Sequence, residues 1–133
     1  MRAMRLEGEW GPEHIKEVEL PDPEPKIGEI VISMKATAIN PRDLILSRRG
    51  YGRHSGNLPL IPLADGAGHV CDQGAGANKF QIGDLVCPIY NRYWLTGTSD
   101  FAHSGGSHGG PLDGTQCEKM LIPEAAVVRA PSY

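Results

Sequence analysis

Asn40-Pro41-Arg42-Asp43 is the run that decides the fold, together with Ala64-Asp65-Gly66-Ala67-Gly68-His69-Val70 and Gly83-Asp84-Leu85-Val86-Cys87-Pro88 further along the chain. The first run predicts a short helix, because Asn40 suits the cap, Pro41 the first helical position and Asp43 the first turn. Arg48 and Arg49 fall in its expected last turn, and Gly50 follows as the stop. The other two runs predict strands bounded by turns.

The residues before Asn40 form the clearest predicted strand, at 30–39. Because side chains alternate along a strand, Ile30, Ile32, Met34, Ala36 and Ala38 are expected on one face. Ser33, Lys35 and Thr37 are expected on the other. Further strands are expected at residues 1–6, 15–20, 66–73, 85–89, 116–122 and 127–130, with a long loop at 91–114. Seven short strands predict a mainly β fold, a partly open β-barrel with one or two short helices.

Length and composition limit the function classes. A chain of 133 residues is one domain by size, and 40% hydrophobic with 22% charged residues fits a soluble core. A net charge of −3 gives no electrostatic case for nucleic acid or an anionic membrane. No apolar stretch approaches the roughly 20 residues of a membrane span, and the charged N-terminus is unlike a signal peptide. Cys71, Cys87 and Cys117 indicate free thiols in a reducing cytoplasm.

In this order, the motifs resemble the GroES-like catalytic domain of the medium-chain dehydrogenase/reductase superfamily, which holds alcohol dehydrogenases and quinone oxidoreductases. The likeness covers nearly the whole chain and is strongest at residues 30–88 and at Gly109-Gly110-Pro111-Leu112-Asp113-Gly114. It implies that residues 1–133 are the substrate-side domain of an oxidoreductase. The family's Rossmann domain, with its Gly-rich fingerprint, would follow Tyr133. The chain is therefore expected to be truncated before that domain, inactive alone, and dependent on a nucleotide-binding domain in cis or in trans.

Departures from the family pattern point to its zinc-independent branch. Zinc-dependent members carry a cysteine where this chain has Asn40, and Gly-His-Glu where it has Leu63-Ala64-Asp65. A catalytic zinc needs three protein ligands and an open position. The structural zinc of those members needs closely spaced cysteines, whereas Cys87 and Cys117 lie far apart. The expectation is NADP or NAD as cofactor, and no zinc.

Three residues are predicted to be catalytic. The resemblance implies that Asn40 faces the nicotinamide and the substrate, which is compatible with its capping the helix. Arg42 replaces the Ser or Thr that relays a proton in zinc enzymes. It would meet a cofactor phosphate, polarise a carbonyl, or remain a solvated surface side chain. Tyr51 follows the helix stop, where a phenol could donate a hydrogen bond to a carbonyl oxygen while presenting an apolar face.

Four further residues are predicted at the substrate or cofactor cleft. Asp43 could pair with Arg42 or Arg48, and a purely structural role at the helix N-terminus is the stronger interpretation. Asp65 sits where the family's acidic residue meets the cleft, but turn bonding explains it nearly as well. Tyr93 and Trp94 would wall the pocket or anchor the long loop.

Two other patterns are interpreted as structural. Gly66, Gly68, Gly74 and Gly76 lack the third glycine and the strand-to-helix context of a phosphate loop, so they are expected at turns and at close strand contacts. His103, His108 and Cys117 lack metal-ligand spacing, and no metal is expected there.

The function predicted from these residues is hydride transfer between NAD(P) and a carbonyl, enone or quinone. Without zinc, hydrogen-bond donors must meet the developing negative oxygen, which suits a delocalised enone or quinone better than a simple alcohol. The alternative is a non-catalytic small-molecule-binding or assembly module, although the polar 96–110 segment is unlike the apolar mobile loop of ring-forming co-chaperonins. An unpaired strand edge in the absence of the family's C-terminal segment predicts a homodimer.

Overall fold

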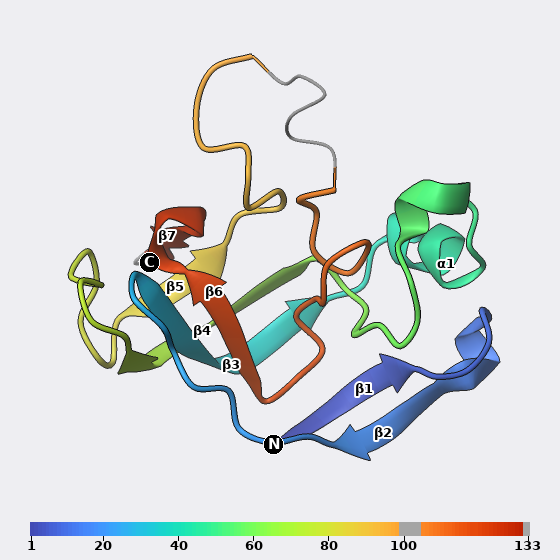
Figure 1. The fold of residues 1–133 in the computed structure, drawn as a ribbon, viewed down its shortest axis with the longest axis horizontal. Coiled ribbons are helices and arrows are strands. Elements are labelled where there is room, and N and C mark those ends of the chain that lie inside the picture. The colour runs from blue at the N-terminus through green and yellow to red at the C-terminus, as the bar shows by residue number, and fades with distance from the viewer. Residues whose placement is uncertain (99–104, 132–133) are drawn as a thin grey trace.

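The computed structural model describes residues 1–98 and 105–131 as a curved sheet with a hairpin and a helix at one end (Figure 1). The five-stranded sheet has the order β6-β3-β4-β5-β7, with every neighbouring pair antiparallel. A two-stranded hairpin, β1-β2, lies beside it. The strands are β1 (Arg2–Leu6), β2 (Ile15–Glu19), β3 (Glu29–Ala38), β4 (Asp65–Gln73), β5 (Leu85–Pro88), β6 (Lys119–Pro123) and β7 (Val127–Arg129).

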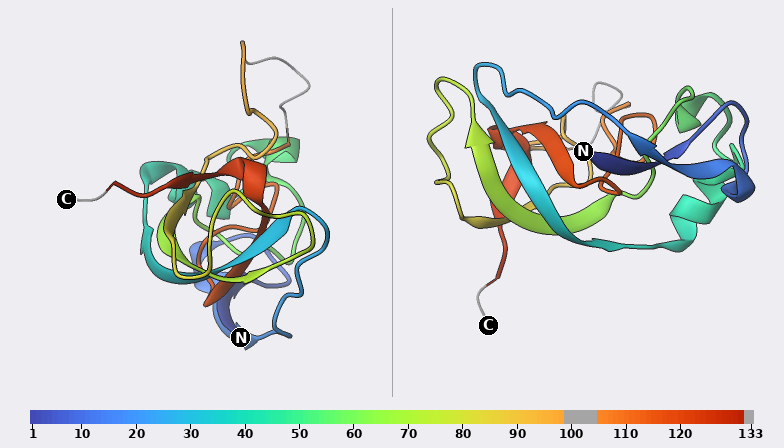
Figure 2. Two further views of the ribbon diagram at one scale, coloured as in Figure 1. Left: turned by 90° about the vertical axis from the view of Figure 1, so that its left-hand side faces the viewer. Right: turned by 90° about the horizontal axis from the view of Figure 1, so that it is seen from below.

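The expected mainly β, partly open barrel is confirmed. Figure 2 shows the long strands β3 and β4 curving so that the sheet forms a half-barrel. A single α-helix, α1 (Pro41–Ser47), is found among the described residues, together with short 3₁₀ turns such as η2 (Gly52–Ser55). None of the helices in the described ranges is long and apolar enough to cross a membrane.

Strand β6 begins three residues later than the sequence predicts. The preceding residues 116–118 bond mainly to the hairpin, and only the Glu118 carbonyl also accepts a hydrogen bond from β3, from the Met34 amide at 2.9 Å. The Met4 amide donates to the Gln116 carbonyl at 2.9 Å, and the Glu118 amide donates to the Arg2 carbonyl at 3.0 Å. This segment therefore joins β1 to the main sheet before β6 pairs with β3.

The predicted alternation along β3 is correct in its first half and wrong in its second. Ile30 and Ile32 are fully buried, but Ala36 and Ala38 are exposed. The register against β4 shifts between Val31 and Ile32 and again between Met34 and Ala36. The first shift leaves Cys71 of β4 unpaired and the second leaves Lys35 of β3 unpaired, so the alternation of faces along β3 is interrupted only at Lys35. The second half of β3 also extends past Lys119, the first residue of β6, and has less to pack against.

Two apolar clusters hold these elements together. The larger fills the half-barrel and contains Ile30, Ile32, Val70, Phe80, Val86, Met120, Ile122, Ala126 and Val127. The smaller consists of Leu6, Leu46 and Leu60, one each from β1, α1 and the segment after η2. Leu6 and Leu60 also exchange two backbone hydrogen bonds, of 2.8 and 3.2 Å. The smaller cluster thus fixes the helix against the hairpin.

The helix ends earlier than expected, at Ser47, so Arg48 and Arg49 lie beyond its last turn. Arg49 adopts a left-handed conformation with φ 57, and the Gly50 amide donates to the Ile45 carbonyl at 2.8 Å. A non-glycine residue pays a strain cost in this region. Its guanidinium lies 5.9 Å from the centre of the Trp10 ring, a cation–π contact that partly offsets that cost.

The structural interpretation of the glycines is confirmed at β4. A Cβ on Gly66 would meet the Ala36 carbonyl oxygen at 2.9 Å, and one on Gly68 would meet the Met34 Cα at 2.8 Å. Both glycines therefore allow β4 to approach β3 closely, as expected for packing and not for a phosphate loop.

We expect Ile32→Ala to lower the free energy of unfolding by about 3 kcal/mol, because it leaves a cavity beneath β3. Ile32 is fully buried. The matched control is Ile27→Ala, since Ile27 is 84% exposed and its truncation should cost less than about 0.5 kcal/mol. Urea unfolding followed by circular dichroism measures both. Equal costs for the two variants would contradict the assigned core.

Candidate active site

The N-terminus of α1 is capped by hydrogen bonds between Asn40 and Asp43. The Asn40 backbone amide donates to Asp43 Oδ2 at 2.8 Å, and the Asp43 amide donates to the Asn40 carbonyl at 2.9 Å. Asp43 is buried, and its other oxygen lies 3.7 Å from Arg42 Nη1. These contacts are those expected for a structural role of Asp43 at the helix start. Its carboxylate lines a separate cavity of about 190 Å³, together with Leu63 and Gln116.

Asn40 and Asp65, 25 positions apart, meet where α1 and β4 begin. The Asn40 side-chain amide donates to Asp65 Oδ2 at 2.7 Å. The Asp65 carbonyl in turn accepts a 2.9 Å hydrogen bond from the Thr115 hydroxyl. An ionised carboxylate only accepts hydrogen bonds, so this contact fixes which way the Asn40 amide points. One N–H of that amide remains for another acceptor.

Arg42 ties α1 to the loop that follows residue 105. Its Nη1 donates to the His108 carbonyl at 3.2 Å, and its Nη2 donates to the Gly110 carbonyl at 2.6 Å. The guanidinium also lies 5.1 Å from the centre of the Tyr90 ring. With 19% of its side chain exposed, Arg42 is not a solvated surface residue. Its contacts are mostly structural, and its charge remains at the edge of the cavity described next.

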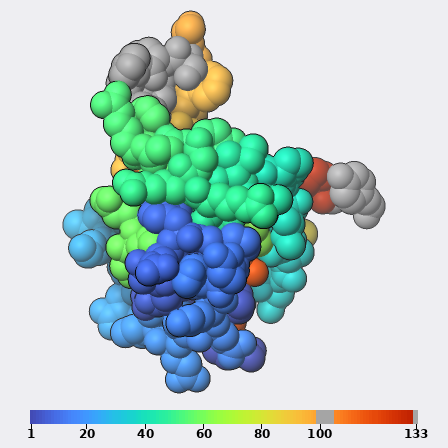
Figure 3. Space-filling view, turned by 90° about the vertical axis from the view of Figure 1, so that its right-hand side faces the viewer, coloured from blue at the N-terminus to red at the C-terminus, as the bar shows by residue number. Residues whose placement is uncertain are grey.

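Two adjoining cavities lie between η2 and this loop. Figure 3 shows the side of the molecule on which the segment of α1 and η2, in green, lies next to the hairpin, in blue. The first cavity, of about 210 Å³, is lined by Arg42, Tyr51, His54, Tyr90, Ser107 and Gly110. The second, of about 360 Å³, is lined by Arg53, His54, Tyr90, Asn91, Gly105, Ser107 and Pro111. The shared residues make them one polar recess, here called the η2 recess.

The η2 recess includes some predicted site residues and omits others. Arg42 and Tyr51 line it together, and 42% of Tyr51 is exposed. Tyr93 and Trp94 are exposed and line neither cavity. Tyr93 stacks under Arg92 at 5.5 Å, and Trp94 Nε1 donates to the Gly97 carbonyl at 2.9 Å. Those contacts fit the alternative role, in which both aromatics anchor the long loop.

Sequence reasoning missed Tyr90, His54 and Ser107. Tyr90 directly follows the strand expected at 85–89, and an aromatic side chain at a strand end was an available signal. His54 and Ser107 come together only because the loop returns to η2, and no local pattern predicts that contact.

His108 and Cys117 have other hydrogen-bond partners in the described structure. His108 is buried, and its Nδ1 contacts the Asp113 carbonyl at 3.1 Å. Burial, followed by the Arg92 and Arg42 charges, lowers the pKa of His108 and keeps it neutral. Burial raises the pKa of Cys117 to about 12, so its thiol stays protonated. His103 lies outside the described residues, and within them no three His, Cys, Asp or Glu side chains cluster as metal ligands.

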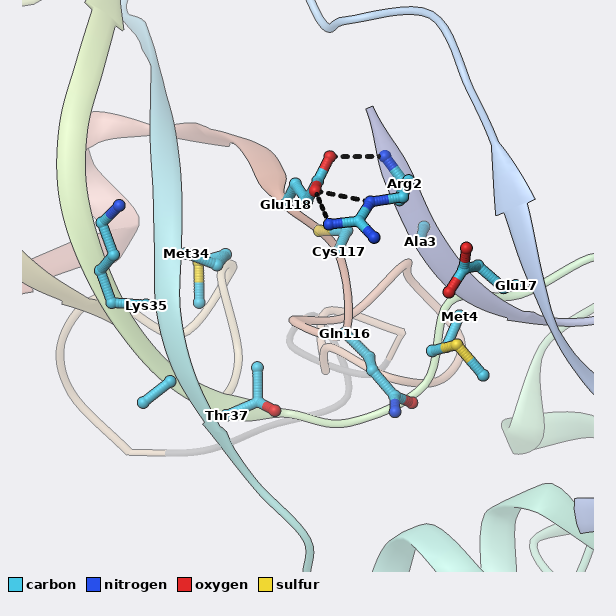
Figure 4. A pocket seen from close by; sticks show the side chains of 11 residues that line it. Arg2, Ala3, Met4, Glu17, Met34, Lys35, Thr37, Gln116, Cys117 and Glu118 are labelled. Atoms are coloured by element: carbon cyan, nitrogen blue, oxygen red, sulfur yellow. Dashed lines mark hydrogen bonds and ion pairs between the residues drawn. The ribbon is translucent and has the colours of Figure 1, made fainter.

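A second cleft, of about 360 Å³, separates β1 from the later part of β3 (Figure 4). Its charged lining is largely occupied by an ion pair, in which Arg2 Nη2 lies 2.7 Å from Glu118 Oε1. The Arg2 backbone amide donates to the same carboxylate at 2.8 Å. Lys35 and Thr37 line it from β3. The cleft follows the part of β3 that extends past β6, and its polar groups form no catalytic arrangement.

Comparison with known proteins identifies the family. Residues 26–132 match the alcohol dehydrogenase GroES-like domain, and the chain belongs to that family. A zinc-type alcohol dehydrogenase-like protein of Schizosaccharomyces pombe is 38% identical over 107 residues, which are 78% of this chain and 30% of that protein. A chloroplast envelope quinone oxidoreductase homolog of Arabidopsis thaliana is 34% identical over 97 residues, 71% of this chain and 28% of that protein.

Solved structures agree with the fold. An NAD-dependent alcohol dehydrogenase superposes with a TM-score of 0.81 at 29% identity, covering 98% of this chain and 40% of that one. The chain thus spans less than half the length of these relatives, and corresponds to their GroES-like portion. The resemblance to this superfamily is confirmed at the level of the domain.

We expect the chain to lose stability as the pH falls from about 7.5 to about 5.5, because His108 is held neutral when folded. Its folded pKa is lowered. The associated stability is therefore present above the unfolded value of about 6.5 and is lost as the pH falls through the folded value. Urea unfolding at each pH measures the slope. His108→Gln should flatten it, while the exposed His54→Gln should not. An unchanged slope in His108→Gln would contradict a neutral buried imidazole.

Proposed function

We propose that residues 1–133 are the substrate-side part of a zinc-independent, NAD(P)-dependent oxidoreductase that acts on a carbonyl, enone or quinone. The observation that carries this proposal is the Asn40 amide, oriented by Asp65 at 2.7 Å at the start of the helix whose Arg42 lines the η2 recess. Family membership supports the same class of reaction.

The chain's own residues would stabilise the oxygen of the substrate. A nicotinamide held by the nucleotide-binding domain would supply the hydride chemistry, and the protein would have to stabilise the negative charge on the carbonyl oxygen of the substrate. The second N–H of Asn40 and the exposed Tyr51 hydroxyl are donors for that oxygen. Arg42 contributes positive charge, since two backbone carbonyls already occupy its N–H groups. The predicted catalytic residues thereby divide into two donors and one positioning cation.

The residues present do not fit a catalytic zinc. Ala64, where zinc-dependent relatives carry histidine, is buried and has no donor atom in its side chain. Asn40 is already engaged with Asp65. Nor do the described strands form the parallel βαβ unit that cradles a dinucleotide, because every pair is antiparallel. We therefore propose that a nucleotide-binding domain, in cis or in trans, completes the enzyme. We also propose, from the three free cysteines, that the enzyme acts in a reducing cytoplasm.

A chimera tests the reaction. Residues 1–133 replace the corresponding N-terminal part of the Arabidopsis relative, and oxidation of NADPH or NADH is followed with a quinone or an enone. We expect turnover by the chimera and none by residues 1–133 alone, because hydride transfer needs the nicotinamide held against the substrate. A folded chimera inactive with every acceptor would refute the proposal.

Variants of the chimera test the roles. Asn40→Ala should lower kcat/KM by about 100-fold and Tyr51→Phe by about 10-fold, because each removes a donor to the developing oxyanion. Asp43→Asn should cost less, since it acts on the helix start. Exposed Glu24→Gln is the matched surface control. A chelator should leave the rate unchanged. Full activity in Asn40→Ala, or zinc-dependent activity, would contradict these assignments.

We further propose that the chain associates as a homodimer through the open edge of β3. Strand β6 pairs with β3 only over Glu29–Ser33, so residues 35–38 have β4 on one side and no described strand on the other. Such edges template pairing with another chain. Sedimentation at roughly 50 µM should show a dimer, and exposed Ala36→Glu should yield a monomer through like-charge repulsion. Ala75→Glu, in an exposed turn, is the control. A monomeric parent chain would exclude the dimer.

A further inference from the structure

We propose that the η2 recess selects substrates that carry an anionic group, a carboxylate or sulfonate, next to their conjugated ring, and that Arg53 binds that group. This inference rests on the proposed function for the reaction, but the binding preference can be measured without turnover.

The charge of the recess is opposite to that of the chain. The chain has a net charge of −3. Among the described residues that line the two cavities, Arg42 and Arg53 are cationic, His54 is titratable, and no aspartate or glutamate is present. Positive charge concentrated in a recess raises the local concentration of anions.

The two arginines differ in how far they are already occupied. Arg42 is held by the His108 and Gly110 carbonyls and has Asp43 at 3.7 Å. Arg53 is exposed, and its guanidinium has no hydrogen bond or ion pair within residues 1–98 and 105–131. A free guanidinium offers a planar pair of N–H donors that match a carboxylate. Arg53 is thus free to bind an anionic group, whereas the guanidinium of Arg42 is already engaged by backbone carbonyls.

The rest of the lining suits a flat conjugated ring. The centre of the Tyr90 ring lies 5.1 Å from the Arg42 guanidinium, and Tyr51 is a second aromatic residue that lines the same cavity. Aromatic rings favour offset stacking or edge-to-face contact with another ring. Ser107 and Asn91 add neutral polar groups without adding negative charge. The combined volumes, of about 210 and 360 Å³, fall within the range of small-molecule sites.

The test compares 2-naphthoate with 2-naphthamide, two probes of nearly the same shape that differ in charge and undergo no redox reaction. Binding to residues 1–133 is measured by NMR titration of the backbone amides, which also locates the site. We expect 2-naphthoate to bind about 10-fold more tightly at low salt, and the difference to shrink as salt is added. The shifted amides should lie at residues 51–56 and 105–111.

Arg53→Ala should remove this preference and leave the affinity for 2-naphthamide unchanged. The matched control is Arg48→Ala, which removes the same charge from an exposed position that lines neither cavity. Equal affinity for the two probes, a preference that survives in Arg53→Ala, an equal loss in Arg48→Ala, or shifts elsewhere would each overturn the inference. If the preference holds while the chimera transfers no hydride, only the proposed function fails. If the chimera is active without any preference, only this inference fails.

Discussion

The hydrogen bonds from Arg42 to the Gly110 and His108 carbonyls are the constraint on which the candidate site depends. They join the first turn of α1 to a loop about 66 to 68 positions further along the chain. Other hydrogen bonds also hold this loop, among them the 3.1 Å bond from the His108 amide to the Tyr90 carbonyl, but those from Arg42 are the ones that tie it to the helix. An arginine suits this task because its rigid fork of donors can serve two carbonyl groups at once. The same guanidinium lies in the wall of the η2 recess, so Arg42 both positions the loop and gives the recess positive charge.

Below that contact, the leucine cluster of Leu6, Leu46 and Leu60 sets where the helix lies. Each residue comes from a different segment, so the hairpin, the helix and the η2 segment are placed together. The Asn40–Asp65 hydrogen bond then links the helix start to β4, which belongs to the main sheet. The candidate donors therefore sit on elements anchored to both apolar clusters, as a preorganised site requires.

Local patterns predicted much of this architecture. The strands and the helix start follow from alternation, turn residues and the Asn40-Pro41 cap, because those signals act over a few residues. The exposure of Ala36 and Ala38 could not be predicted, since it follows from the bulge at Lys35 and from where β6 begins. Family resemblance identified Arg42, Tyr51 and Asp65. It did not identify His54, Tyr90 and Ser107, because they meet only where the loop returns to η2, and that contact produces no periodic pattern in the sequence.

The partial burial of Cys117 bears on the proposed reaction with enones or quinones. Such molecules are soft electrophiles that add to thiolates. With its pKa raised to about 12, Cys117 exists at neutral pH as roughly one thiolate in 10⁵ molecules. Cys71, by contrast, is exposed. The proposed acceptors would therefore reach Cys71, on β4, more readily than Cys117, in the segment that joins the hairpin to the sheet. Covalent modification would then begin at Cys71, whose side chain is exposed.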